Sequence, residues 1–254
     1  MASSNIPAEV IAAYSEIDVS CIADVLAGQR LNCVVEGIFP VGGHRHVPRA
    51  RAADGKAFPI LCGPAVTMRQ IATQELGVDA VRHQQVLLEV CEPGDVLVVE
   101  MGGRMDCCGW GGNMNADAKN RGIGGVVIDG TVRDTEPLTE SGVPIFCRGV
   151  SNRHTHGLYY SCCINNEPIQ IGTMPYQVMV KPGDLLVGDV DGLVVVPHEK
   201  AVELLPLVQE RHDADLKMWD LITAGKGHDT PEVEELLAEV RDLEGVTQTE
   251  GYKL

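Results

Sequence analysis

Residues 121–134, RGIGGVVIDGTVRD, decide the fold of this chain. The segment 122–125 should end a helix that begins near Asn113, and Val126–Ile128 is a short apolar run of the kind that forms a strand buried on both faces. A similar run, Val96–Val99, lies before that helix and follows a Pro-Gly-Asp turn. A helix between two apolar strands predicts a βαβ unit and therefore an α/β fold.

Further elements are expected on both sides of this unit. Two strands, Phe58–Leu61 and Ala65–Met68, should flank a turn at Gly63-Pro64. A helix is expected from about Gly77 to Cys91. The apolar run Leu185–Val187, which also follows a Pro-Gly-Asp sequence, should form another buried strand.

The C-terminal part of the chain differs from the rest, because it is acidic and helical from Glu199 onward. The sequence Thr230-Pro231-Glu232 is a favourable helix start. One face of that helix is apolar and carries Val233, Leu236, Leu237, Val240 and Leu243. We therefore predict a main domain over 1–198 and a helical extension over 199–254, whose apolar face the main domain or a neighbouring subunit must cover.

The composition limits the classes of function. The chain has 254 residues, with 20 Lys and Arg against 36 Asp and Glu, which gives a net charge of −16. Such a chain repels nucleic acids and anionic membranes, and no apolar run reaches the roughly 18 residues of a membrane span. The N-terminus lacks the features of a secretory signal, so a cytoplasmic location is expected. The nine Cys residues contain no Cys-x-x-Cys pair and thus indicate no zinc site.

Arg133 and Asp134 follow the central apolar strand and carry the clearest chemistry. Loops at strand ends in α/β folds are where reactive groups gather. The guanidinium of Arg133 can clasp a carboxylate in two places, and Asp134 offers the hard oxygen that Mg²⁺ or Mn²⁺ prefers. Together they could hold a 2-oxo acid, with its carboxylate on the Arg and its keto oxygen on the metal. The alternative is an ion pair that only ties a turn.

A glycine-rich segment, Trp110-Gly111-Gly112-Asn113, stands at the start of the predicted helix. Backbone N–H groups at a helix N-terminus bind anions, and glycines let a ligand come close. A plain turn between a strand and a helix would look the same in sequence. Arg148, Arg153 and His154 follow the next strand and could reach a second carboxylate of the substrate, or could be solvated loop charges.

Motifs spread over about residues 20–200 resemble those of the RraA-like proteins, which include 4-hydroxy-4-methyl-2-oxoglutarate aldolases. These motifs are GPAVT (63–67), PGDVLVV (93–99), WGG (110–112), RGIGGVVIDGTVRD (121–134), PIQIG (168–172), PGD (182–184), GDVDG (188–192) and VVVP (194–197). The resemblance implies an αββα sandwich, similar to swivelling domains, that assembles as trimers or dimers of trimers with active sites between subunits.

The resemblance also implies roles for particular residues. Asp134 would reach Mg²⁺ or Mn²⁺, and Arg133 would contact the pyruvoyl part of the substrate together with backbone amides of Gly111, Gly112, Asn113 and Met114. The aldolases carry an acid 21 residues before the Arg, where this chain has Gly112. Asp106, Asn113 or Asp117 could stand in for it, and spacing does not single one out.

These observations predict a divalent-metal-dependent lyase that cleaves a C–C bond of a small 2-oxo acid, by retro-aldol reaction or decarboxylation, through a pyruvate-like enolate. Neither Lys119 nor Lys181 has the surroundings of a Schiff-base lysine, which favours the metal route. A homo-oligomer, either a trimer or a hexamer, is expected, with no nucleic acid or membrane partner. Two alternatives stay open: a non-catalytic RraA-type regulator that binds ribonuclease E, and a lyase or hydrolase acting on a different small acid.

Overall fold

The predicted βαβ unit is present in the computed structural model, which describes residues 6–42, 59–72, 83–154, 159–162, 164 and 167–243. Strand β3 (Val96–Glu100) lies parallel to β5 (Gly125–Val132), and helix α4 (Gly112–Arg121) lies between them in sequence. Gly122 ends α4 in the left-handed conformation that favours glycine. Apart from the half-buried Glu100, both strands are buried along their whole length, which fits their largely apolar sequence.

The strands form one large sheet and a small hairpin. Along the large sheet the order is β1 (Phe39–Pro40), β6 (Ile145–Val150), β5, β3, β2 (Leu61–Ala72), β10 (Leu185–Gly188) and β11 (Leu193–Val196). In addition, β4 (Cys108–Trp110) pairs with β5, and β7 (Tyr159–Cys162) pairs with β2. The hairpin consists of β8 (Ile169–Ile171) and β9 (Val178–Val180).

The turn expected at Gly63-Pro64 is wrong, because β2 runs through it as one strand. Residues 61–64 pair with β10 in antiparallel fashion, whereas residues 65–69 pair with β3 in parallel fashion. Pro64 therefore marks the point at which one strand changes partners, and its missing N–H is not needed there. Gly63 is required at this point, because a Cβ atom on it would lie 2.0 Å from the carbonyl oxygen of Gly94.

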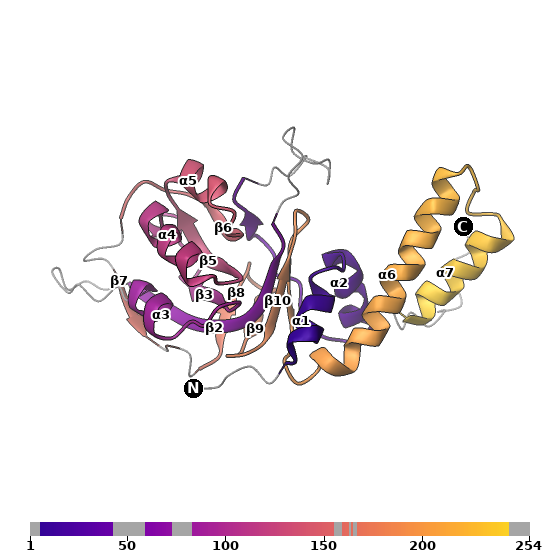
Figure 1. Ribbon diagram of the computed structural model, residues 1–254, viewed down its shortest axis with the longest axis horizontal. Coiled ribbons are helices and arrows are strands. Elements are labelled where there is room, and N and C mark those ends of the chain that lie inside the picture. Colours follow the sequence, from indigo (N-terminus) through magenta and orange to yellow (C-terminus); the bar gives the residue numbers. More distant parts are fainter. Residues whose placement is uncertain are drawn as a thin grey trace.

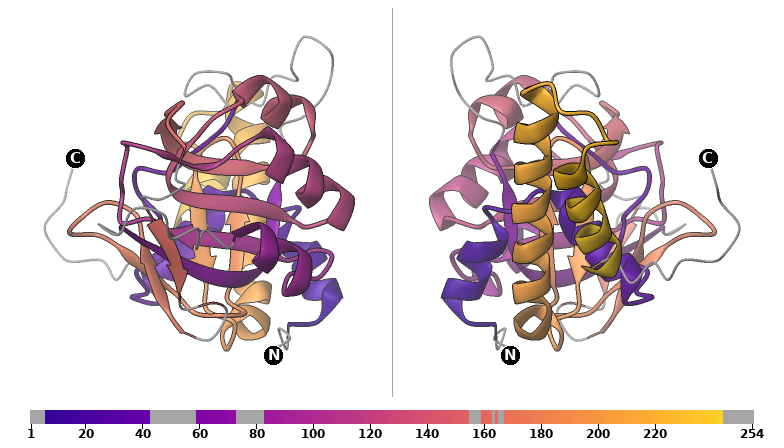
Figure 2. Two further views of the ribbon diagram at one scale, coloured as in Figure 1. Left: turned by 90° about the vertical axis from the view of Figure 1, so that its left-hand side faces the viewer. Right: turned by 90° about the vertical axis from the view of Figure 1, so that its right-hand side faces the viewer.

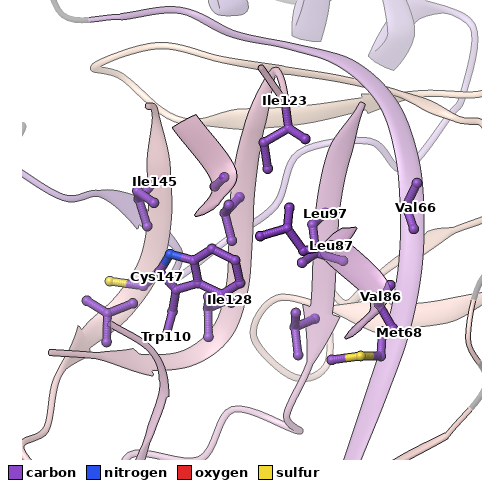
Figure 3. Close-up of a cluster of buried hydrophobic side chains, with 14 of the residues drawn as sticks. Val66, Met68, Val86, Leu87, Leu97, Trp110, Ile123, Ile128, Ile145 and Cys147 are labelled. Atoms are coloured by element: carbon purple, nitrogen blue, oxygen red, sulfur yellow. The ribbon is translucent and has the colours of Figure 1, made fainter. Parts of the chain in front are cut away.

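The molecule is an αββα sandwich with four layers (Figure 1). The parallel strands form one β layer, and β10, β11 and the hairpin form the other, with one apolar core between the two layers. A further apolar core lies between each β layer and the helices outside it. The outer helices of one side, α3 (His83–Glu89), α4 and α5 (Thr135–Glu140), pack on the parallel strands. Alternate side chains of β3 divide between two cores: Leu97 and Val99 face these helices, whereas Val96 and Val98 face β10, β11 and the hairpin. Figure 3 shows the first core, where Val86 and Leu87 of α3 approach Met68 and Leu97.

The fourth layer consists of α1 (Ala8–Tyr14), α2 (Val19–Gly28) and the N-terminal half of α6 (Ala201–Thr223). Arg211 of α6 is buried and pairs with Asp24 of α2 at 3.0 Å. Helix α7 (Pro231–Leu243) turns back along α6, as Figure 2 shows. Its residues Val233 and Val240 are buried. Helix α6, which belongs to the extension itself, thus covers part of the apolar face of α7. This corrects the expectation that the main domain or a neighbouring subunit must cover it, although Leu236, Leu237 and Leu243 are only half-buried. The domain boundary at 198/199 stays a prediction.

Of the expected helix over 77–91, the structure describes α3, and residues 77–82 lie outside the described part, as does Phe58. None of the helices in the described ranges is long and apolar enough to cross a membrane.

We expect Gly63→Ala to lower the free energy of unfolding by about 1–3 kcal/mol or more, because its Cβ would overlap backbone that cannot easily move. The matched control is Gly192→Ala, whose Cβ would meet nothing within 4 Å and which should change stability little. Urea unfolding of the two variants measures the difference. Equal stability of both would contradict the close approach of Gly94 to β2.

Candidate functional site

The glycine-rich segment 110–113 and the pair Arg133-Asp134 meet at the carboxyl edge of the parallel strands. Strand β4 pairs with β5, with Trp110 opposite Val132. Each strand leads directly into its candidate residues, β4 into Gly111-Gly112 and β5 into Arg133-Asp134. The N–H of Arg133 donates to the carbonyl of Trp110 at 3.0 Å, which fixes one segment against the other.

Asp134 is held in an unusual backbone conformation, with φ of +57° in the left-handed region. Its Oδ2 accepts the N–H of Gly112 at 3.0 Å and lies 3.7 Å from Nε of Arg133. A carboxylate at the N-terminus of α4 is favoured by the helix dipole. Its Oδ1 accepts no hydrogen bond within the described part of the chain, and the side chain is 47% exposed. One oxygen is thus anchored, while the side chain as a whole remains accessible.

The amide of Gly112 was expected to face the substrate, but Asp134 already occupies it. The amides of Asn113 and Met114 are in the first turn of α4, where N–H groups have no acceptor within the helix. Gly111 is needed for the approach of the two segments, because a Cβ on it would lie 2.9 Å from Oδ2 of Asp134.

A cavity of about 170 Å³ lies at this edge. All six candidate residues line it: Gly111, Gly112, Asn113, Met114, Arg133 and Asp134. His154 lines it as well, and so do His83, Gln84 and Cys108, which sequence reasoning did not select. Since a water molecule takes about 30 Å³ of liquid, the cavity suits a small acid.

The sequence model of the RraA-like family, described as Aldolase/RraA, matches residues 17–195. This chain belongs to the RraA-like family. A protein of Halalkalibacterium halodurans that is provisionally named a 4-hydroxy-4-methyl-2-oxoglutarate aldolase is 28% identical over 207 residues, which is 82% of this chain and 85% of that protein. A relative from Arabidopsis thaliana with the same kind of provisional name is 32% identical over 144 residues, 55% of this chain and 76% of that one.

Solved structures agree on the RraA-like fold. An uncharacterized protein from Pseudomonas syringae matches with a TM-score of 0.72 and 24% identity, over 92% of this chain and 100% of that one. RraAS2 of Streptomyces coelicolor, described as an unusual member of the RNase ES inhibitor RraA protein family, matches with a TM-score of 0.67 and 24% identity, over 89% and 100%. At these identities the likeness shows the fold alone.

Arg148 of this RraA-like chain does not line this cavity with Arg133 and Asp134 but borders a separate cavity of about 420 Å³. This corrects the expectation that it could reach a substrate bound by Arg133 and Asp134. It pairs instead with Asp129, whose side chain is fully buried, at 2.6 Å. Arg148 also donates to the carbonyl of Gly172, and Asp129 accepts the N–H of Gly103. Burial raises the pKa of Asp129, and the Arg148 guanidinium opposes that rise. The pair fixes the loop that leads into β4.

Of the three residues proposed to replace the missing family acid, Asn113 lines the cavity, whereas the two acids are engaged elsewhere. Asp106 pairs with Arg104 at 2.9 Å, and Asp117 accepts from Gln84 at 2.8 Å. Neither carboxylate lines the cavity. Among the described residues, Asp134 is thus the one carboxylate that lines the cavity. This fits Mg²⁺, which is often held by one or two carboxylates together with waters and substrate.

A second group of possible ligands, Asp184, His198 and Glu199, lies at the opposite edge of the sheet, where β10 begins. Both carboxylate oxygens of Asp184 accept backbone N–H groups, from Lys181 and His198. Glu199 pairs with the Lys181 ammonium at 2.8 Å. These groups satisfy one another, so the cluster caps the turn rather than marking a metal site.

Proposed function

We propose that this chain is a divalent-metal-dependent lyase that cleaves a C–C bond of a small 2-oxo acid. The observation that carries the proposal is the accessible carboxylate of Asp134 beside the guanidinium of Arg133, both of which line one small cavity. The provisional names of the relatives from Halalkalibacterium halodurans and Arabidopsis thaliana support the same class of reaction.

Different groups of this cavity would bind different parts of the substrate. Arg133, which is 44% exposed, would bind the 1-carboxylate through its forked N–H groups. The first-turn amides of Asn113 and Met114 would add hydrogen bonds to the same end. Asp134 would hold Mg²⁺ or Mn²⁺, which when bound supplies Lewis acidity toward the 2-oxo oxygen. Because Oδ2 is fixed by Gly112, Oδ1 is oriented before the ion binds.

Cleavage leaves a pair of electrons on C3, which the 2-oxo group delocalises as an enolate. Positive charge from Arg133 lowers the free energy of this state more than that of the neutral keto group. In decarboxylation of an oxaloacetate-like acid, CO₂ leaves and no proton needs to be removed first. In a retro-aldol reaction, the hydroxyl at C4 must lose its proton to a base.

Pyruvate release, measured with coupled lactate dehydrogenase, tests this proposal. The substrates are oxaloacetate and a panel of 4-hydroxy-2-oxo acids, each with Mg²⁺ or Mn²⁺ and with EDTA. We expect turnover of at least one of them that EDTA abolishes and added metal restores. Turnover that EDTA leaves unchanged would contradict a metal-dependent reaction. No turnover on any substrate would favour a binding role.

Gly112→Asp should tighten Mn²⁺ binding on the order of tenfold, because it places a second carboxylate next to Asp134. There is room for it, since a Cβ at Gly112 would lie 3.4 Å from Cβ of Asp134 and 3.5 Å from its Oδ2. A tenfold change corresponds to about 1.4 kcal/mol, a modest gain for an extra charged ligand. Gly112→Asn is the control of equal size without charge. If both variants bind Mn²⁺ equally well, the ion does not lie beside Asp134.

A further inference from the structure

His83 borders the same cavity as Arg133 and Asp134. It is the first residue of α3 and is only 9% exposed. Its ring lies against the indole of Trp110, with the ring centroids 5.9 Å apart. Since Trp110 leads directly into Gly111-Gly112, the imidazole is held at the wall formed by the segment that anchors Asp134.

Gln70 holds the Nδ1 side of this ring. It lies on β2, two residues after Met68 and on the face of the strand that points toward α3. Its Nε2 is 2.7 Å from Nδ1 of His83, and the residue is 3% exposed. Its Oε1 is buried and has no hydrogen-bond partner in the part of the chain that is described. A buried, unpartnered amide oxygen costs free energy and calls for an explanation.

A glutamine amide can serve each charge state of an imidazole. With its NH₂ toward the ring, Gln70 donates to an unprotonated Nδ1. After a half-turn of the amide, Oε1 accepts from a protonated Nδ1. Because Nδ1 faces Gln70, any proton exchanged with a ligand must move at Nε2. A ring that stays hydrogen-bonded in both charge states is what a proton-transfer residue needs.

We propose that His83 is the proton-transfer residue of this cavity, with Gln70 as its positioning residue. The inference rests on the proposed lyase function and assigns the base that the retro-aldol reaction requires. Nε2 of His83 takes the proton of the C4 hydroxyl, the C3–C4 bond breaks, its electron pair forms the enolate, and a carbonyl forms at C4. The imidazolium then returns the proton to C3, which gives pyruvate and regenerates neutral His83.

Among the residues that the structure describes, four other titratable groups line the cavity: Cys108, Arg133, Asp134 and His154. Burial raises the pKa of the Cys108 thiol, which keeps it protonated and a poor base. The guanidinium of Arg133 carries only hydrogen-bond donors, and Asp134 is anchored on Gly112. His154 is an exposed residue beyond β6, whereas His83 is fixed by both Gln70 and Trp110. Of these groups, His83 best combines a proton-transfer side chain with a fixed orientation.

Exchange of the pyruvate methyl protons with D₂O, followed by NMR with Mg²⁺ present, tests the proposal, because exchange requires a base at C3. We expect His83→Asn to slow exchange on the order of a hundredfold. Oxaloacetate decarboxylation removes no proton, so it should fall much less, and the ratio of exchange to decarboxylation should drop at least tenfold. A purely structural role of His83 would lower both rates in parallel, and an unchanged ratio would overturn the proposal.

Gln70→Glu provides a second readout that packing alone would not move. A carboxylate at Nδ1 favours the imidazolium, so the pH midpoint of exchange should shift upward. A pH midpoint equal to that of the wild type would contradict the positioning role of Gln70. A wild-type protein that decarboxylates oxaloacetate but never exchanges pyruvate protons would refute the role of His83 and leave the lyase standing. If it does neither, the lyase proposal itself fails.

Discussion

Asp134→Asn should reduce metal-dependent pyruvate release on the order of a hundredfold or more, while the fold stays intact. Lewis-acid stabilisation is worth several kcal/mol, and each 1.36 kcal/mol is a factor of ten in rate. The amide of Asn can still accept the N–H of Gly112, and Asn tolerates the left-handed backbone at this position. The substitution therefore removes the charge of the ligand and preserves the cap of α4.

The matched control for this prediction is Asp106→Asn, which removes a carboxylate that pairs with Arg104 and does not line the cavity. Its turnover should stay within about twofold of the wild type, since surface ion pairs contribute little. Steady-state rates at saturating Mg²⁺ measure both variants. Equal losses in the two would show that net charge, not a ligand at Asp134, explains the effect.

Arg148→Met should lower the free energy of unfolding by about 3–5 kcal/mol at neutral pH, because it leaves the buried carboxylate of Asp129 without its partner. The loss should depend on pH. Burial already raises the pKa of Asp129, and removing the opposing guanidinium raises it further. The folded variant then binds more protons than the unfolded chain, so its stability falls as pH rises from about 4 through the raised pKa.

Urea unfolding at pH 5 and pH 8 checks this prediction, with the larger loss expected at pH 8. Adding Asp129→Asn to Arg148→Met removes the titrating group, so the double variant should lose the extra pH dependence. A loss in Arg148→Met that is identical at both pH values would mean that Asp129 is not held in a low-dielectric environment.

Local sequence patterns predicted the elements that follow simple rules. Val96–Val99 and Val126–Ile128 are apolar at every position, and each lies in a strand with cores on both faces. The helix between them ends at Gly122, as its glycines indicated. The pair Gly63-Pro64 led to a wrong prediction of a turn, because glycine and proline usually mark turns. Here they lie where one strand passes from β10 to β3, and β10 is more than 100 residues away in sequence.

The candidate site was predictable only in part. Asp134 and Gly112 could each be selected by residue type. The hydrogen bond between them could not be predicted, because it follows from the pairing of β4 with β5. Arg148 was misjudged, since nothing local shows that Asp129 is its buried partner. His83 was missed because its partners, Gln70 and Trp110, come from other elements of the chain.

Mn²⁺ binding in the presence of oxalate, followed by electron paramagnetic resonance, tests most directly whether Asp134 and Arg133 present a 2-oxo acid to a metal. Oxalate resembles the planar, charged end of the enolate. We predict that the wild type binds Mn²⁺, that oxalate tightens this binding, and that Arg133→Gln removes the effect of oxalate. Asp134→Asn should abolish the binding. Mn²⁺ bound as tightly by Asp134→Asn as by the wild type would contradict the site.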